Sequence, residues 1–447
     1  MSDTQLAAES ASKPPADPDL REVIAWAFYD FANSGYTTVV LTAIYGTYFV
    51  AVVAGPDTGM ASGTATFLWT LAIAIANFCV LVSAPIIGAI ADFRASKKKF
   101  LWWTTAACVS GTALMAAAGP GDVTLGMILL IIATIAFSAG ENLIAAFLPE
   151  IASPSNMGRI SGYGWSLGYF GGLLTLGTCL FYINWASGLG QEPSDYVPVT
   201  LIITAGIFAL SAAPTFIYLR ERAVPRERPI GVSYWRLGLD EVGKTLRNAR
   251  HFKDLFRFIV CLTAYQSGVA TVIVIAAIYA QAVMGFDSQQ LIILIMVVNL
   301  TASIGAFVFG MAQDRYGSVP TLAAGLLVWL AAIGVTYFAE SPSDVWLAGN
   351  LMGLAMGATQ AGGRALIGQL TPVERSAEFF GLWGFASRAA AIIGPLSYGV
   401  ISYFSNGDHR MAMLSTAAFF LVGLVLLFTV DEKRGVEARK NDALTVQ

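Results

Sequence analysis

Charged side chains are scarce in this sequence. Asp, Glu, Lys and Arg make up 12% of its 447 residues, whereas hydrophobic residues make up 56%, and the mean hydropathy is +0.65. A soluble protein of this length needs far more charge to cover its surface. Apolar stretches of about 20 residues recur along the chain, each long enough to cross a bilayer of about 30 Å as a helix. The composition predicts an all-α integral membrane protein.

Residues that usually carry enzyme chemistry are also scarce. The only two His residues are His251 and His409, and they fall in loops predicted on opposite sides of the membrane. The sequence contains no P-loop, G-x-S-x-G or HExxH motif. Its four Cys residues lie in apolar stretches without CxxC spacing, which is typical of buried packing residues. We therefore expect no enzyme, no cofactor and no bound metal, and any transport cycle must be driven by an ion gradient or by the substrate gradient.

Twelve apolar spans are predicted, and the basic residues orient them. The connections after spans one, three, five, seven and nine contain no Lys or Arg, and the connection after span eleven contains only Arg410. By the positive-inside rule, both termini and the long middle segment are predicted to be cytoplasmic. The spans lie near residues 23–53, 64–92, 99–119, 122–148, 160–184, 197–219, 255–283, 289–314, 318–338, 344–369, 376–402 and 409–430.

The middle segment divides the spans into two groups of six. Within it Trp235, Leu239, Val242 and Leu246 recur at helical spacing among basic residues. This pattern fits a helix that lies on the lipid surface, and a solvated linker helix is the alternative. The expected domains are a disordered cytoplasmic tail (1–20), a six-helix bundle (21–219), a cytoplasmic middle loop with the amphipathic helix (220–254), a second six-helix bundle (255–430) and a cytoplasmic tail (431–447).

The two groups of spans carry a repeated pattern. Asn77, Gly88 and Asp92 in the first half recur, 222 residues later, as Asn299, Gly310 and Asp314. Asn and Asp are disfavoured in apolar helices, so coincident matches at one offset indicate an internal duplication. Paired halves in a membrane protein are typical of secondary transporters.

Several segments resemble the major facilitator superfamily. Residues 88–99 are similar to its loop signature between helices two and three, and residues 310–317 to the weaker repeat between helices eight and nine. A narrower resemblance links the chain to the branch of the fungal autophagy-related vacuolar amino-acid effluxer and its bacterial relatives. The resemblance implies twelve transmembrane helices in two pseudo-symmetric six-helix bundles, with helices one, four, seven and ten around a central cavity. The segments that carry the narrower match are 26–34, 147–151, 158–172, 378–381 and 394–395.

Four ionisable side chains fall well inside predicted spans: Asp30, Glu141, Arg364 and Arg388. Each would cost about 2.5–3.5 kcal/mol at a lipid-facing position in mid-bilayer, so such residues face the protein interior or a water-filled cavity. Glu141 and Arg364 occupy nearly equivalent places in the two halves and are predicted to form a gating pair. In the functional hypothesis, Glu141 or Asp30 takes up a proton while Arg364 holds a substrate carboxylate. The alternative is a set of fixed ion pairs that hold helices together.

Other polar residues in the spans are candidates for the cavity lining. Asn33, Tyr265, Gln266 and Gln360 would suit a small zwitterion, although such residues also commonly hydrogen-bond between helices. At the cytoplasmic helix ends, a second set resembles the superfamily's conformational latch, in which an acid caps the N-terminus of a neighbouring helix. The alternative is an exposed loop turn. The latch candidates are Gly88, Asp92, Arg94, Gly310, Asp314 and Arg315.

The sequence thus predicts a secondary active transporter of a small polar solute, with an amino acid or related carboxylate favoured and the proton as candidate coupling ion. We expect a monomer in a bacterial inner membrane, with the solute, protons and the lipid bilayer as partners and no nucleic acid. Two alternatives stay open. One is a facilitated exporter without ion coupling, and the other is a transporter-like sensor or scaffold that does not transport.

Overall fold

The computed structural model describes residues 19–55, 58–60, 63–225, 232–247, 251–286, 288–404 and 409–445. Throughout these ranges the regular secondary structure is helical. Residues 1–18 of the predicted tail (1–20) lie outside the described residues. The first helix begins at Leu20, within the predicted tail.

The first half of the chain forms six long helical spans. The first span is bent where π-helical segments interrupt it, and the fourth ends in a short extra helix. The elements are α2 (Leu20–Tyr36), η1 (Thr37–Ala43), α3 (Tyr45–Tyr48), η2 (Phe49–Val53), α4 (Thr64–Phe93), α5 (Lys97–Leu114), η4 (Met115–Ala117), α6 (Val123–Ala145), α7 (Leu148–Ile151), α8 (Met157–Gly188) and α9 (Pro193–Tyr218).

The second half repeats this architecture, after a helix in the middle loop, α10 (Tyr234–Arg247). Its last span is broken, and a final helix follows it at an angle of 62°. The elements are α11 (Lys253–Met284), α12 (Ser288–Tyr316), α13 (Ser318–Tyr337), α14 (Pro342–Leu370), η5 (Val373–Arg375), α15 (Ser376–Phe404), α16 (His409–Ser415), α17 (Ala417–Leu427) and α18 (Glu432–Thr445).

Fewer helices meet the length and hydropathy expected of a membrane span than the twelve spans predicted. Among the described residues, 10 helices are long and apolar enough to cross a membrane, or 11 with the bent pair. α14 is not among them, although it is 29 residues long and packs against α12 and α13. Asn350, Gln360 and Arg364 lower its hydropathy. Its glycines permit close packing: a Cβ at Gly357 would lie 2.5 Å from the backbone nitrogen of Ala306 on α12. This helix therefore sits where the tenth span was predicted, despite its weaker hydropathy.

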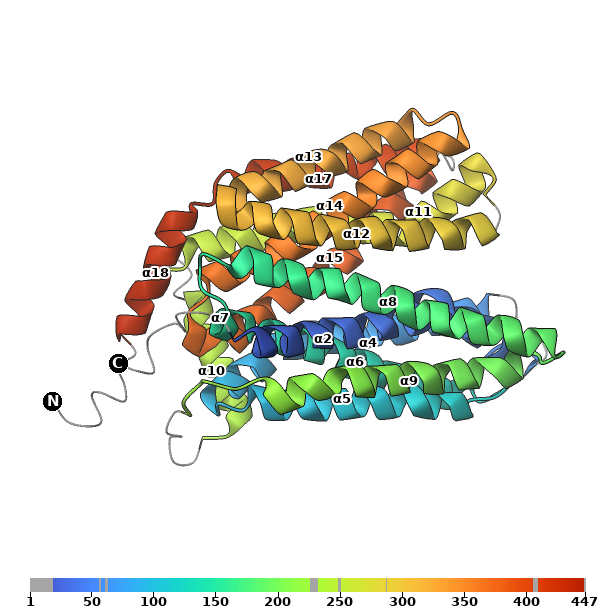
Figure 1. The fold of residues 1–447 in the computed structure, drawn as a ribbon, viewed down its shortest axis with the longest axis horizontal. Coiled ribbons are helices and arrows are strands. Elements are labelled where there is room, and N and C mark those ends of the chain that lie inside the picture. The colour runs from blue at the N-terminus through green and yellow to red at the C-terminus, as the bar shows by residue number, and fades with distance from the viewer. Residues whose placement is uncertain are drawn as a thin grey trace.

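Two helix pairs, α4 with α15 and α8 with α12, make the most extensive contacts between the two halves (Figure 1). Glycine permits the close approach in both pairs. A Cβ at Gly310 of α12 would lie 2.7 Å from the carbonyl oxygen of Gly158 on α8, and one at Gly381 of α15 would lie 2.6 Å from that of Ala84 on α4. The start of α2 and the helices α10 and α18 lie at one end of the molecule (Figure 1). We call it the predicted cytoplasmic end.

The C-terminal segment, expected as a tail over residues 431–447, is largely helical. α18 crosses the predicted cytoplasmic end of the second bundle. Glu432 accepts a 2.9 Å hydrogen bond from the backbone of Ser318 at the start of α13, and Arg434 donates a 2.6 Å bond to Asp254 at the start of α11. Such contacts at two helix N-termini fix α18 in place, and no hydrophobic pattern in the sequence indicated them.

The amphipathic helix predicted in the middle loop is present as α10. A Cβ at Gly238 would lie 3.0 Å from side-chain atoms of both Ile86 and Ile90, so α10 packs closely on α4. Trp235 and Leu239 are exposed on its other side. The side chain of Leu246 lies outside the described residues. Contact of this helix with lipid stays a prediction.

All four cysteines are free, and Cys108, Cys179 and Cys261 are buried, in agreement with a packing role.

Candidate substrate and gating site

An ion pair joins the two halves of the protein near the start of the first helix. Asp30 of α2 accepts a 2.6 Å hydrogen bond from Nη1 of Arg364 on α14. Arg364 also donates to Ser161 of α8, from Nη2 to the carbonyl oxygen at 2.9 Å and from Nε to Oγ at 3.1 Å. Its guanidinium lies 4.6 Å from the ring centre of Trp26 and 5.3 Å from that of Trp165. All three nitrogens of Arg364 are therefore engaged, and the side chain is only 3% exposed.

Gly164 of α8 makes room for this arrangement. A Cβ at this position would lie 2.5 Å from Nη2 of Arg364 and 2.7 Å from the ring of Trp26. No side chain fits there without displacing the pair. A glycine on α8 thus creates the space for the guanidinium.

A second ion pair also joins the halves, and it is more open. Glu141 of α6 accepts a 2.9 Å hydrogen bond from Nη2 of Arg388 on α15. The two side chains are 25% and 18% exposed, respectively. Nη1 of Arg388 makes a long bond of 3.4 Å to Asn77 of α4, and its Nε has no partner among the described residues. Glu141 also lies within electrostatic range of Asp30 and Arg364, so the four charges form one cluster.

The predicted pairing of Glu141 with Arg364 is wrong. Each forms its ion pair with a different partner, Glu141 with Arg388 and Arg364 with Asp30. The prediction used the equivalent positions of Glu141 and Arg364 in the two halves. Residues related by a twofold axis meet only when they lie on that axis, and these two lie off it.

The polar lining candidates fall into two groups. Asn33 is buried, and its Oδ1 has no partner among the described residues. Gln266 donates a 2.9 Å hydrogen bond to Gln360, while its own Oε1 is likewise unpaired within the part of the chain that the structure describes. Tyr265 differs, because it is fully buried with its hydroxyl group against Gly363. Tyr265 is thus a packing residue between α11 and α14 in this conformation.

The two acids proposed for the latch both cap helices of the opposite half. Oδ2 of Asp92 accepts a 2.8 Å hydrogen bond from the backbone of Glu378 at the start of α15. Asp314 accepts bonds of 2.8 and 3.0 Å from the backbones of Gly158 and Arg159 at the start of α8. A carboxylate at a helix N-terminus satisfies free N–H groups and interacts favourably with the helix dipole. The expected capping geometry is present, and its role in gating remains a proposal.

The two arginines among the latch candidates lie against aromatic rings. Arg94 stacks over Tyr234 of α10 at 4.7 Å, and Arg315 lies 5.5 Å from the ring of the adjacent Tyr316. The cation that faces Asp92 is Lys97, at 3.6 Å. Arg94 thus contacts the middle-loop helix, whereas Lys97 at the start of α5 is buried beside Asp92. A latch role for Arg94 and Arg315 stays a prediction.

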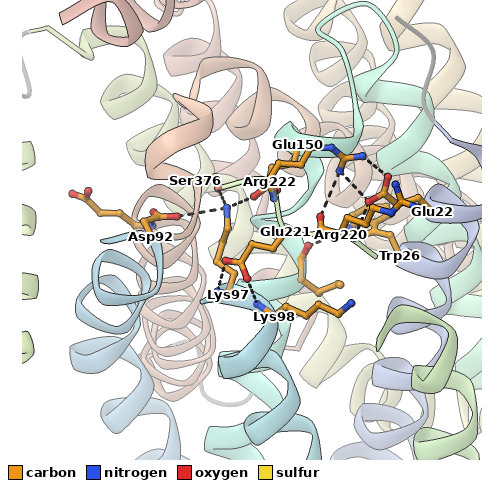
Figure 2. Close-up of polar contacts among 12 residues, drawn as sticks. Glu22, Trp26, Asp92, Lys97, Lys98, Glu150, Arg220, Glu221, Arg222 and Ser376 are labelled. Atoms are coloured by element: carbon orange, nitrogen blue, oxygen red, sulfur yellow. Dashed lines mark hydrogen bonds and ion pairs between the residues drawn. The ribbon is translucent and has the colours of Figure 1, made fainter. Parts of the chain in front are cut away.

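Lys97 is the centre of a buried polar cluster (Figure 2). Its side chain has no solvent exposure, forms an ion pair with Glu150 of α7 and donates a 2.8 Å hydrogen bond to Ser376 of α15. Ser376 belongs to the second half of the chain, so this cluster also holds the halves together. Sequence reasoning did not select Lys97 or Glu150, although both lie in segments that carried the family resemblance.

The segment after α9 extends the cluster (Figure 2). Glu221 accepts hydrogen bonds of 2.6 and 3.1 Å from the backbones of Lys97 and Lys98 at the start of α5. Arg222 forms a 2.6 Å ion pair with Glu22. Burial raises the pKa of Glu221, and the hydrogen bond with Glu22 raises the pKa of Arg222. The beginning of the middle loop is thus anchored to the first bundle.

Comparison with known proteins identifies the family. The family model described as "Vacuole effluxer Atg22 like" matches residues 58–159 and 155–440. The chain belongs to this family. The Atg22-like chain is 28% identical over 424 residues to the MFS-type transporter YxiO of Bacillus subtilis. This alignment covers 94% of the Atg22-like chain and 97% of YxiO. It is 23% identical over 309 residues to Autophagy-related protein 22-1 of Aspergillus niger, a match that spans 64% of the chain and about half (49%) of that longer protein.

Solved structures confirm the fold. The human organic anion transporter MFSD10 matches with a TM-score of 0.72 at 16% identity, over 93% of the Atg22-like chain and 100% of that protein. The proton:xylose symporter XylE matches with a TM-score of 0.69 at 14% identity, over 95% and 98% of the two chains. The Atg22-like chain therefore has the all-helical fold of major facilitator transporters, and its relatives are membrane transporters rather than enzymes, as the sequence predicted.

Proposed function

We propose that this protein is a secondary transporter that moves a small polar solute, an amino acid or a related carboxylate, by alternating access between its two halves. The observation that carries the proposal is the pair of ion pairs, Asp30–Arg364 and Glu141–Arg388, each of which joins the first half to the second. Charges are costly within a membrane. Placed between two halves that can tilt, they provide contacts that differ between conformations.

The contacts between the halves close the predicted cytoplasmic end. To open it, the protein must separate Arg364 from Asp30 and release the Asp92 and Asp314 caps from their helices. Leaving one partner of a buried ion pair without the other costs about 3–5 kcal/mol. A solute that replaces the lost contacts lowers this cost, because a ligand shifts an equilibrium by its differential affinity for the two states.

Proton coupling is the favoured mechanism within this proposal. A proton on Asp30 would neutralise the carboxylate and weaken its bond to Arg364. A facilitated exporter is the second candidate, and it is favoured by the fact that Asp30 and Glu141 each already have an Arg partner. In that cycle the ion pairs exchange partners with the solute and no proton crosses the membrane. The name of the matched family, an effluxer, favours export as the direction.

We place the protein in the plasma membrane of a bacterium with both termini in the cytoplasm, since basic residues collect in the corresponding connections. YxiO, a bacterial relative, supports this location. We expect a monomer. Labelling of single engineered cysteines with a membrane-impermeant reagent in intact cells tests the orientation.

Flux in reconstituted vesicles tests the proposed function. We expect uptake of one or more radiolabelled amino acids, faster when a pH gradient is imposed if protons are coupled and unchanged if they are not. The Arg364→Ala variant should lose flux, whereas Asn299→Ala should keep it, because the Asn299 amide bonds only to the backbone of its own helix at 2.8 Å in the described structure. Vesicles that move no solute of any class, with correctly folded protein, would refute a transport function.

A further inference from the structure

The two membrane-embedded arginines differ in what they can still bind. Arg364 donates hydrogen bonds from all three nitrogens, is stacked against two Trp rings and is 3% exposed. Arg388 makes one short bond and one long bond, keeps an unpartnered Nε among the described contacts, and is 18% exposed. A guanidinium has five donor hydrogens. The described bonds use three of these donors in Arg364 and two in Arg388, and Arg388 is the more exposed of the two. Arg388 is therefore the more accessible of the two arginines to a ligand in this conformation.

The carboxylate beside Arg388 also has free capacity. Glu141 accepts one described hydrogen bond, from Nη2 of Arg388, and a quarter of its side chain is exposed. A carboxylate can accept about four hydrogen bonds. Because α6 and α15 belong to different halves, a ligand that binds both side chains spans the interface that must rearrange during transport.

The surroundings of this pair are polar and have unused donors. Asn142 follows Glu141 on α6, is 7% exposed, and has an Nδ2 without a partner in the described part of the chain. A Cβ at Gly384 of α15 would lie 2.5 Å from Oδ1 of this amide. Asn77 approaches Arg388 from α4. One amide thus contacts Arg388 itself, and a second lies against Gly384, one turn before Arg388 on α15.

We infer that Glu141 and Arg388 form the solute-binding subsite and that its ligand is a zwitterion, whose ammonium group binds Glu141 and whose carboxylate binds Arg388. This inference rests on the proposed transport function and names the residues and the substrate class. A zwitterion that enters between the two side chains replaces one ion pair by two, so neither Glu141 nor Arg388 is left unpaired. A simple anion would leave Glu141 unpaired beside a second negative charge, and a simple cation would leave Arg388 unpaired.

This assignment gives the two arginines separate roles. Arg364 holds the halves together through Asp30 and Ser161, whereas Arg388 recognises the solute. An α-amino acid with an uncharged side chain is the simplest ligand, since its two charged groups match the subsite and add no net charge to the membrane interior. Arg388 lies on α15, a helix that the family resemblance does not count among the cavity-lining helices.

Binding to the purified full-length protein tests the ligand class. Thermal shift is measured with each of the twenty common amino acids. Any that stabilises the protein is then compared with its N-acetyl derivative, its decarboxylated amine and its deaminated acid. We expect stabilisation by the zwitterion and at least a tenfold loss of affinity for all three derivatives. Equal binding of the deaminated acid, or of the amine, would overturn the zwitterion assignment.

Variants test the residues. Arg388→Gln should lose zwitterion binding at least tenfold, and Arg388→Lys should restore part of it. Because Arg388→Gln leaves Glu141 without its partner and can impair folding, the double variant Glu141→Gln/Arg388→Gln is the second test. The double change leaves no uncompensated charge, which is the main cost when one partner of a buried pair is removed. The double variant should elute as a folded protein and still fail to bind, while Asn299→Ala binds as the wild type does. Wild-type affinity in the double variant would overturn the inference.

Flux separates failure of this inference from failure of the proposed function. If vesicles transport a sugar, an anion or a cation but no zwitterion, the subsite assignment is wrong and the transport function stands. If amino acids are transported with unchanged affinity after Arg388→Lys and in the double variant, the subsite lies elsewhere. If no solute is transported at all, both proposals fail.

Discussion

Replacing Asp30 by Asn should open the predicted cytoplasmic end. The change keeps the size of the side chain and an oxygen that can accept from Arg364, but it removes the negative charge from a 2.6 Å bond. A hydrogen bond to a charged group contributes about 1.5–3 kcal/mol. The loss falls on the closed conformation alone, because the pair must already be separated when the halves tilt apart.

This energy corresponds to a shift in the conformational equilibrium of roughly 13- to 160-fold. If the open conformation were populated at about 1% in the wild type, it would rise to roughly 10–60% in Asp30→Asn. Spin labels on two exposed side chains at the predicted cytoplasmic end, Lys99 of α5 and Tyr316 of α12, report the separation of the halves. Each is replaced by Cys in a protein whose four native cysteines have been removed.

Double electron–electron resonance should show a new population at longer distance in Asp30→Asn. Asp122→Asn is the matched control, since Asp122 is exposed and bonds to the backbone of Gly119 in its own loop at 3.0 Å. An unchanged distance distribution in Asp30→Asn would show that the Asp30–Arg364 pair does not hold the closed conformation. A shift of the same size in the control would assign the effect to a general loss of stability.

Three further changes probe the interface at other points. Lys97→Met leaves the carboxylate of Glu150 buried without its cation and should lower stability by about 3–5 kcal/mol in thermal unfolding, whereas the exposed Lys99→Met should change little. Gly88→Leu would place a side chain against the backbone of α15. The closed conformation, which gives the short distance between the spin labels at positions 99 and 316, should therefore be lost. Gly238→Leu would push α10 away from α4, and hydrogen exchange in residues 234–247 should accelerate without loss of the transmembrane fold.

Hydrophobic pattern and charge placement were sufficient to predict the helices. The predicted limits of the spans agree with the observed helices within a few residues, for example 64–92 against Thr64–Phe93 for α4. The reason is physical: backbone groups in lipid must bond within the segment, so a long apolar stretch has few alternatives to a helix. α18 was not predicted, because its attachment depends on polar contacts such as Glu432 with Ser318, which lie far apart in the sequence.

The sequence singled out the charged residues of the candidate site but not their pairing. The energetic cost of a charge inside a span drew attention to the four residues that form the two ion pairs, and their roles in transport stay predictions. The cost could not decide partners, because helix rotation determines which side chains meet. Trp165 and Ser161, which surround Arg364, gave no such signal: an aromatic and a hydroxyl residue are common in membrane helices and carry no charge.

Pseudo-symmetry accounts for the pairing once the helices are in place. The spacing from Glu141 to Arg364 is 223 residues, and the spacing from Trp165 to Arg388 is also 223 residues. The ion pair Glu141–Arg388 and the stacking of Arg364 on Trp165 are therefore equivalent contacts, one in each half of the interface. Asp92 and Asp314 also make equivalent contacts, since each caps a helix of the other half. The interface is built twice, and its two copies differ in chemistry. One copy pairs an acid with a partly exposed arginine, and the other stacks a tryptophan on an enclosed arginine. On the proposed mechanism, this difference lets one copy hold the halves together while the other binds the solute.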